Sequence, residues 1–376
     1  MKWRPRELVQ RYIRERRVVA CHAFAVTRLA GAGTRRHSAP MSDPLHTRAL
    51  SVTLAAAPGG ALAARASLLD VRKVGVVPVG GDLATPGIVH HMWLDALLDP
   101  VGPRVVSLAA QQPNVAFEPS DLTGGESCRD PAARLSALEG ATLDAEFARR
   151  LSSAQGGARG CSHILTLAQV LVAAVSWALG PGGVAAADPR RRAGERVFRR
   201  DILLDGARRP DGDLELVAQL TDLACAPAAE VVRPLDRFAG LHEVRVWAPV
   251  EVATLTFGDL RAVERRRDAR ALADTAWGDR AARVAGLRGL SLFRGVSAAM
   301  MAQLGDPADR ALLDACLMLA PTFIQVCGAM SDAWLARAAA ADSVIGMGGL
   351  PDSCYMWRRD GALDRLRGPN DPVPTL

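Results

Sequence analysis

Alternation of apolar and polar residues predicts β-strands near the start of the chain. Residues 49–57 and 61–70 alternate in this way and flank Pro58-Gly59-Gly60. Proline and glycine favour turn conformations, so we predict a β-hairpin here. Two more strands are expected at 91–98 and 104–111. Helical spacing then follows at 131–138, at 143–154, and in a long apolar segment that begins after Gly160-Cys161-Ser162 and ends near Gly180.

The same order of patterns returns later in the chain. A second hairpin is predicted over residues 201–222, with its turn at 209–212, and it is followed by predicted strands at 242–247 and 251–263. Helical patterns follow at 279–286, 295–304 and 309–330, and we expect Pro321 to interrupt the last of them. Strands first and helices after, twice, predict an α+β fold rather than a parallel doubly wound one.

The two parts also repeat one another in sequence. Residues 58–70 realign with residues 210–222 at a shift of 152, and Val89-His90-His91 falls on Leu241-His242-Glu243 at the same shift. At a shift of 149, residues 132–140 fall on residues 281–289. We therefore predict a tandem duplication of an antiparallel-sheet-plus-helices domain, packed as a pseudo-dimer. Its predicted parts are copy one at 41–179, a linker at 180–196, copy two at 197–340 and an irregular C-terminal tail at 341–376.

Residue types that bind metals gather in copy one. They are His46, His90, His91, Cys128, Cys161 and His163. The aligned positions of copy two hold Phe198, His242, Glu243, Trp277, Arg310 and Leu312. A role in packing alone would more often be refilled by similar small residues, so the difference favours a functional site in copy one.

Three interpretations of this site remain open. Cys161 and His163 bracket the start of the long helix, where backbone amides favour an anion and lower the pKa of a thiol. A thiolate with imidazoles suits zinc or iron, which predicts a metal site of His90, Cys128, Cys161 and His163, with His46 or His91 nearby as outer residues. The same groups could form a nucleophile pair, in which Cys161 attacks and His90 or His163 is the base. Alternatively, the cysteines and histidines only pack in the core.

Composition limits the partners and the compartment. The net charge is +6, but residues 1–40 contribute +8, which leaves −2 for residues 41–376 and predicts no nucleic-acid partner. We expect residues 1–40 to be a disordered basic arm or an over-extended start before Met41. Seven cysteines without a C-x-x-C pair favour a reducing, cytoplasmic location. The longest apolar stretch, 164–179, contains three polar residues, so we expect a buried helix and no membrane partner.

Several motifs of copy one resemble a known family, the bacterial domain-of-unknown-function family 2889. That family carries an H-x-R start, a Pro-Val-His-Asp-Met strand, a later cysteine and a Gly-Cys-Thr-His-Leu helix start. The matching stretches here are His46-Thr-Arg48, Val89-His90-His91-Met92, Cys128 and Gly160-Cys161-Ser162-His163-Ile164. His91 stands where the family has an acid, and the family's hairpin motif is better kept in copy two, at 208–212. The resemblance implies one cytoplasmic α+β domain per copy and brings no assigned activity.

Two classes of function follow from these observations. The first is an enzyme, a metal- or thiol-dependent hydrolase or lyase that acts on a small organic or acyl substrate, with Cys161, His163 and His90 as its catalytic residues and zinc or iron as its cofactor. The second is a non-catalytic binding or scaffold module, in which copy two supplies an interface and the residues of copy one hold a structural metal or only pack. The sequence predicts neither an oligomeric state nor a particular substrate.

Overall fold

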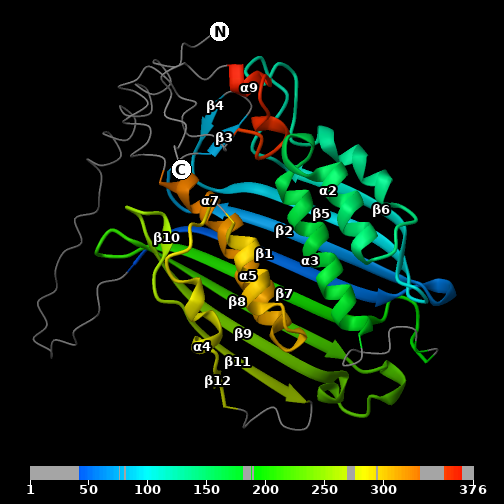
Figure 1. Ribbon diagram of the computed structural model, residues 1–376. Coiled ribbons are helices and arrows are strands. Elements are labelled where there is room, and N and C mark those ends of the chain that lie inside the picture. Colours follow the sequence, from blue (N-terminus) through cyan, green and yellow to red (C-terminus); the bar gives the residue numbers. More distant parts are fainter. Residues whose placement is uncertain are drawn as a thin grey trace, which may run out of the picture.

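The fold is a broad antiparallel β-sheet with helices packed against one face (Figure 1). The structure is a computed structural model, and it describes residues 42–75, 77–79, 82–180, 188, 190–268, 276–293, 295–330 and 351–365. The predicted basic arm at 1–40, and all of the predicted tail except 351–365, lie outside the described residues. The predicted α+β class is confirmed.

The described strands form one large sheet and a separate small hairpin. In chain order they are β1 (Asp43–Ala56), β2 (Leu62–Arg72), β3 (Val77–Val79), β4 (Asp82–Ala84), β5 (Ile88–Asp99), β6 (Arg104–Asn114), β7 (Arg196–Arg208), β8 (Leu214–Cys225), β9 (Phe238–Glu251), β10 (Thr256–Phe257), β11 (Arg261–Asp268) and β12 (Gly278–Asp279). The large sheet has the order β12-β11-β9-β8-β7-β1-β2-β5-β6, with β10 paired to β9, while β3 and β4 pair with each other.

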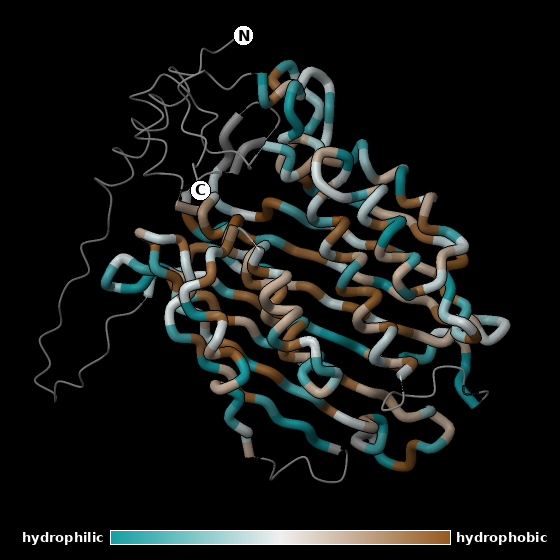
Figure 2. The backbone as a smooth tube through the Cα atoms, viewed as in Figure 1, coloured by the Kyte–Doolittle hydropathy of each residue, from teal (hydrophilic) through white to brown (hydrophobic). Residues whose placement is uncertain are grey.

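The helices follow the strands in each half of the chain. The α-helices are α2 (Ala145–Gln155), α3 (Ser162–Leu179), α4 (Ala281–Val284), α5 (Val296–Leu304), α6 (Arg310–Leu317), α7 (Leu319–Ala329) and α9 (Ala362–Arg365). The 3-10 helices are η1 (Pro58–Gly60), η2 (Asp130–Leu138), η3 (Gly157–Arg159), η4 (Ala228–Glu230), η5 (Pro234–Arg237), η6 (Ala285–Leu287), η7 (Pro307–Asp309) and η9 (Tyr355–Trp357). Hydrophobic residues alternate with hydrophilic ones along the strands (Figure 2), and the apolar side chains on the helix-covered face form the core.

Two predicted elements differ from the structure. The strand predicted at 251–263 is broken in two places. A tight turn at 252–255, in which Leu255 has a positive φ of 55°, separates β9 from β10, and residues 258–260 separate β10 from β11. The helix predicted at 309–330 restarts at Met318 rather than at Pro321. Pro321 instead lies in the first turn of α7, where its missing N–H removes no helical hydrogen bond.

The two halves of the sheet, residues 42–180 and 190–330, have matching strand orders and registers. Outward from the central β1–β7 pair, one half runs β1-β2-β5-β6 and the other runs β7-β8-β9-β11. In the first half Arg48 lies opposite Asp70 on the neighbouring strand, and Asp70 lies opposite His90. The second half pairs Arg200 with Asp222 and Asp222 with His242. The two halves therefore share one sheet and repeat its cross-strand pairing.

Among the described residues, two helical segments are long and apolar enough to cross a membrane by length and composition, 162–179 and 307–329. More than half of each segment is buried within the protein. Both segments pack on the sheet, α3 against β2 and β1, and α7 against β1 and β7. Their apolar character is thus the character of core helices, which is compatible with a soluble protein.

Candidate metal centre

A fully buried carboxylate, Asp70 on β2, is the centre of the candidate site. Arg48 on the neighbouring β1 donates two hydrogen bonds to it, from Nε to Oδ1 at 2.8 Å and from Nη2 to Oδ2 at 2.9 Å. The arginine is itself only 1 % exposed. A bidentate pair of this kind fixes the carboxylate in orientation as well as in charge.

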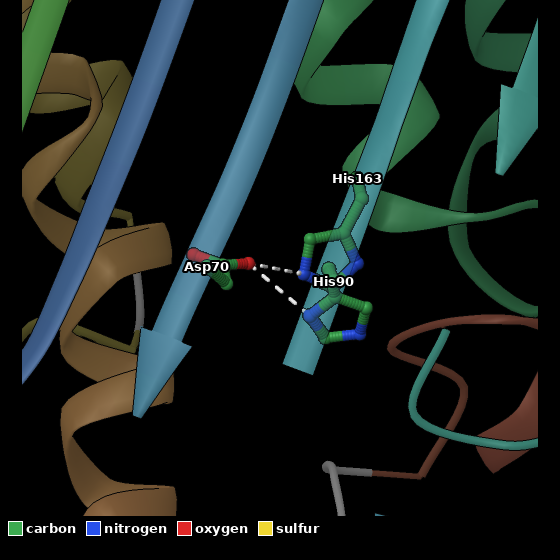
Figure 3. A group of neighbouring side chains, drawn as sticks. All are labelled: Asp70, His90 and His163. Carbon is green, nitrogen blue, oxygen red and sulfur yellow. Dashed lines mark hydrogen bonds and ion pairs between the residues drawn. The ribbon is translucent and has the colours of Figure 1, made fainter. Parts of the chain in front are cut away.

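Three imidazoles converge on the same carboxylate. His46 Nε2 lies 3.0 Å from Asp70 Oδ1, while His90 Nδ1 and His163 Nε2 lie 3.2 and 3.4 Å from Oδ2. His46 and His90 come from β1 and β5. Residues two apart on a strand share a face, and each histidine alternates in step with the buried core residues of its strand, so both lie on the helix-covered face. His163 comes from the first turn of α3. Figure 3 shows His90 and His163 directed at Asp70, and their ring centroids are 3.8 Å apart.

Burial and charge set the protonation of these groups. Burial opposes the charge of Asp70, but the Arg48 guanidinium and the three histidines outweigh burial and hold its pKa well below the ordinary value. Burial lowers the pKa of His163 to about 3, assisted by the neighbouring His90. Burial also lowers the pKa of His46, although the hydrogen bond to Asp70 opposes this shift. At neutral pH the site therefore combines an ionised Asp70 with uncharged imidazoles at His46 and His163.

Asp70, His90 and His163 have the geometry of a metal-ligand set. One ligand atom from each lies within 4.8 Å of the other two, a spacing that no other group of histidine, cysteine and acidic side chains reaches in the described part of the chain. Neutral imidazole and carboxylate are the forms that coordinate a metal ion. Asp70 is the member that sequence reasoning missed. Asp70 is the last residue of the repeated hairpin motif, and the aligned motif of the second half also ends in an aspartate, Asp222. This repetition could have identified Asp70 from the sequence.

The two predicted sulfur ligands lie outside this group. Cys161 lies at the N-terminus of α3, as predicted, where it is the N-cap residue. Burial raises the pKa of its thiol to about 11 despite the backbone amides of His163 and Ile164. The expected lowering by the helix terminus is therefore outweighed by desolvation. Burial also raises the pKa of Cys128 well above the ordinary value. Of the predicted set His90, Cys128, Cys161 and His163, the structure brings the two histidines together around Asp70, and ligation by the two sulfurs stays a prediction.

The two outer histidines have different surroundings. His46 contacts Asp70 directly, whereas His91 is the residue after His90 on β5 and so points to the opposite face of the sheet. On that face its ring lies 5.3 Å from the ring of Trp93. His46 is therefore the candidate for an outer residue of the site.

Helix α7 covers the site from the other side. Gln325 Nε2 lies 3.4 Å from His163 Nε2. Arg72 on β2 is buried beneath the same helix, and a Cβ atom added at Gly328 would lie only 2.4 Å from its Nη2 atom. A glycine at position 328 thus lets the helix approach the arginine.

The second half keeps the ion pair but has no imidazoles converging on it. Arg200 donates to Asp222 through Nε and Nη2, both at 2.7 Å, and its Nη1 donates to Asp314 of α6 at 2.5 Å. His242, which pairs with Asp222 in register, instead bonds Glu264 on β11 at 2.6 Å. The arginine there lies between two carboxylates, so the second half carries a closed ion-pair cluster.

Comparison with known proteins places the first half in a family. Residues 46–176 match the sequence profile of a protein family of unknown function, DUF2889. No curated protein and no solved structure matches the chain. The matched stretch contains Asp70 and all three of the imidazoles that converge on it, and the motifs identified in the sequence fall within it. The segment that carries the candidate metal centre thus matches the DUF2889 family.

Proposed function

We propose that the first half of the protein binds a catalytic zinc or iron ion through Asp70, His90 and His163. The metal would serve a hydrolase or lyase that acts on a small organic or acyl substrate. Two imidazoles and one carboxylate are a ligand set found with both metals. The observation that carries the proposal is the separation of the three ligand atoms.

The separations also fit two ligand atoms that share one metal ion. Two bonds of about 2.1 Å at a tetrahedral angle hold their ligand atoms about 3.4 Å apart. The distances from Asp70 Oδ2 to His90 Nδ1 and His163 Nε2 are 3.2 and 3.4 Å. A charge-assisted hydrogen bond would be shorter, at about 2.7–2.9 Å.

The surroundings support a catalytic rather than a closed site. His46 and Arg48 contact Asp70 from outside the ligand group and would hold its orientation, as outer residues commonly do at metal centres. Three protein ligands leave a coordination position for water or substrate. At that position a metal lowers the pKa of water or polarises a carbonyl oxygen.

The thiol-dependent alternative is less well supported. A cysteine nucleophile acts as its thiolate, and burial keeps Cys161 protonated at neutral pH, with a pKa of about 11. In the non-catalytic alternative the groups hold a structural metal or only pack. Exchange of a water ligand at the bound metal would distinguish a catalytic site from this alternative.

We further propose that the two halves arose by duplication and pack as a pseudo-dimer. Arg48, Asp70 and His90 differ by 152 from their register equivalents Arg200, Asp222 and His242. The mirrored strand order around β1 and β7 supports the same proposal. The second half would then be a degenerate partner that lost its site.

Elemental analysis of matched histidine variants tests the metal proposal. We expect the wild-type protein to bind about one equivalent of zinc or iron at this centre, and His90→Ala to lose at least tenfold in affinity there. His242→Ala is the control, because it removes the histidine at the equivalent register position, and it should leave affinity unchanged. Equal metal content in the wild type and His90→Ala, or none in either, would overturn the proposal.

A further inference from the structure

A C-terminal segment, residues 351–365, packs on the first half of the protein. The Tyr355 N–H donates to Gly160 O at 2.8 Å, immediately before the start of α3. The Trp357 ring lies edge-on to Phe117, with centroids 5.6 Å apart. An ion pair between Arg358 and Glu126 adds a third attachment. This segment is therefore anchored at both the helix start and the loop after β6.

These attachments bring a third cysteine close to two that belong to the first half. Cys354 precedes Tyr355, and Cys161 follows Gly160, so the two cysteines flank a hydrogen-bonded pair of residues. Cys354 and Cys128 pack against one small apolar cluster, whose buried members are Met356, Trp357 and Leu363. Three thiols from widely separated parts of the chain thus gather at one place.

The electrostatics agree with this arrangement. Burial raises the pKa of Cys128 most, and charge on Cys161 and on Cys354 raises it further. Charge on Cys354 also raises the pKa of Cys161. The three thiols are therefore close enough for the charge of one to affect another, because the interaction of two charges falls with their separation. The three cysteines are all free of disulfide bonds.

We propose that Cys128, Cys161 and Cys354 form a second metal site, a thiolate site for a soft cation such as Zn²⁺. Three sulfur ligands select soft metals, and zinc held by three cysteines and one further ligand is a familiar arrangement. Binding breaks three S–H bonds, forms three metal–sulfur bonds and releases three protons to solvent, with no change in oxidation state. This site is separate from the Asp70 centre and does not depend on it.

Metal binding would also tighten the C-terminal segment. In the described part of the chain, only the group around Asp70 has all its ligand atoms within 4.8 Å of one another, so the three sulfurs lie further apart than in a loaded site. Residues 351–365 hold one of the three sulfurs and pack on the surface of the first half. A small inward shift of this segment, with rotation of the cysteine side chains, would close the site.

Cobalt titration of the full-length, reduced, metal-free protein tests the proposal. Co²⁺ bound by sulfur gives an intense ultraviolet charge-transfer band that is absent when its ligands are imidazole and carboxylate. We expect the band in the wild type and at least a tenfold loss of affinity in Cys354→Ser. Cys316→Ser, which removes a buried cysteine of α6, is the matched control and should keep the band.

The variants separate this site from the Asp70 centre. His90→Ala should keep the sulfur band, even though it weakens the proposed catalytic site. Absence of the band in the wild type, or an undiminished band in Cys354→Ser, would overturn the thiolate site and leave the Asp70 proposal untouched. If Cys354→Ser does not fold, alkylation of the wild type supplies the test. Cd²⁺ should then protect the partly buried Cys128 and Cys354 from alkylation but leave the labelling of the partly buried Cys327 unchanged, and equal labelling with and without Cd²⁺ would overturn the proposal.

Discussion

At the scale of single residues, Asp70 is the group on which the charged and polar side chains of the site converge. Its carboxylate receives both hydrogen bonds from Arg48 and faces three imidazoles, and the carboxylate itself is fully closed to solvent. A buried charge is tolerated only when it is paired, because removal of one partner leaves the other without compensation. Asp70 is therefore as important for folding as for the proposed metal binding.

Replacement of this carboxylate should be strongly destabilising. We expect Asp70→Asn to lower the free energy of unfolding by about 3–5 kcal/mol, since it leaves the buried Arg48 without a counter-charge. The matched control is Asp95→Asn, which breaks a bidentate pair with Arg65 on the exposed face and should cost less than about 1 kcal/mol. Urea unfolding of both variants measures the difference, and equal costs would contradict this account of Asp70.

The metal-free protein should lose stability as the pH falls. The pKa of His163 is about 3 in the folded state, so between this value and about 6.5 only the unfolded chain binds its proton. The contribution of His163 is thus present above pH 6.5 and is lost by up to about 1.4 kcal/mol per pH unit below it. The lowered pKa of His46 acts in the same direction. Urea midpoints of chelator-treated protein at pH 7 and pH 5 measure the loss, which should be smaller in His163→Leu.

The thiol of Cys161 should be unreactive in the native protein. Its pKa of about 11 keeps it protonated at neutral pH, and its side chain is buried. We expect iodoacetamide at pH 7.5 to label Cys161 only after the protein is unfolded. The same is expected of Cys316, which is also buried and has a pKa of about 12. Peptide mapping by mass spectrometry makes the comparison. Rapid native labelling of Cys161 alone would support the thiol-dependent mechanism.

Sequence reasoning could identify part of the site and not the rest. His90 and His163 were recognisable because histidines stand out by chemistry and because Leu312 aligns with His163 in the second half. Asp70 was not, since an acid at the end of a hairpin motif is usually exposed, and its burial depends on strand pairing across β1, β2 and β5. The pKa of Cys161 could not be predicted, because its place at a helix terminus is a local feature, whereas the burial that raises its pKa depends on the whole fold.

At the scale of elements, the close approach of α7 to the sheet shapes the site. Gly206 on β7 lies opposite His46 on β1. A Cβ atom added at Gly206 would lie 2.2 Å from Val326 Cγ2 of α7. The glycine therefore allows the helix to approach the sheet beside the imidazoles. The helices and hairpins could be predicted from periodicity, but this contact joins two residues far apart in the chain and has no local signature.

Substitution of this glycine should displace α7. We expect Gly206→Ala to destabilise the protein by about 1–3 kcal/mol through overpacking. It should also weaken metal binding, since α7 carries Gln325 beside His163. Gly240→Ala on β9 is the control, because its added Cβ would lie 3.8 Å from the nearest atom, Arg267 O. Thermal unfolding and metal titration compare the two variants. Equal behaviour of the two would contradict the role given to Gly206.

At the scale of the whole molecule, the pairing of β1 with β7 joins the two halves into one sheet. The pair runs from Asp43 opposite Arg208 to Ala55 opposite Arg196. Separation of the halves would expose two long strand edges and part of the core beneath α3 and α7. The sequence predicted two domains with a linker. It could not predict the shared sheet, because either strand alone looks like the first strand of an independent hairpin.

The protein should therefore unfold as one unit. We expect a single calorimetric transition whose calorimetric and van't Hoff enthalpies agree. A fragment of residues 42–180 alone should be insoluble or oligomeric, because the unpaired edge of β1 is a template for association. Two resolved transitions, or a soluble monomeric fragment, would show that the halves are independent domains.

The repeated arginine–aspartate pair has a consequence for how such a protein could change over generations. In the proposed duplication both copies keep the pair that aligns neighbouring strands, so either copy can lose its imidazoles without losing its register. Phe198 and Leu312 stand in the second copy where His46 and His163 stand in the first, and both are fully buried. Apolar replacements of this kind favour stability over activity. The stability of the degenerate second half would then compensate for the buried polar site of the first half, which is costly in stability.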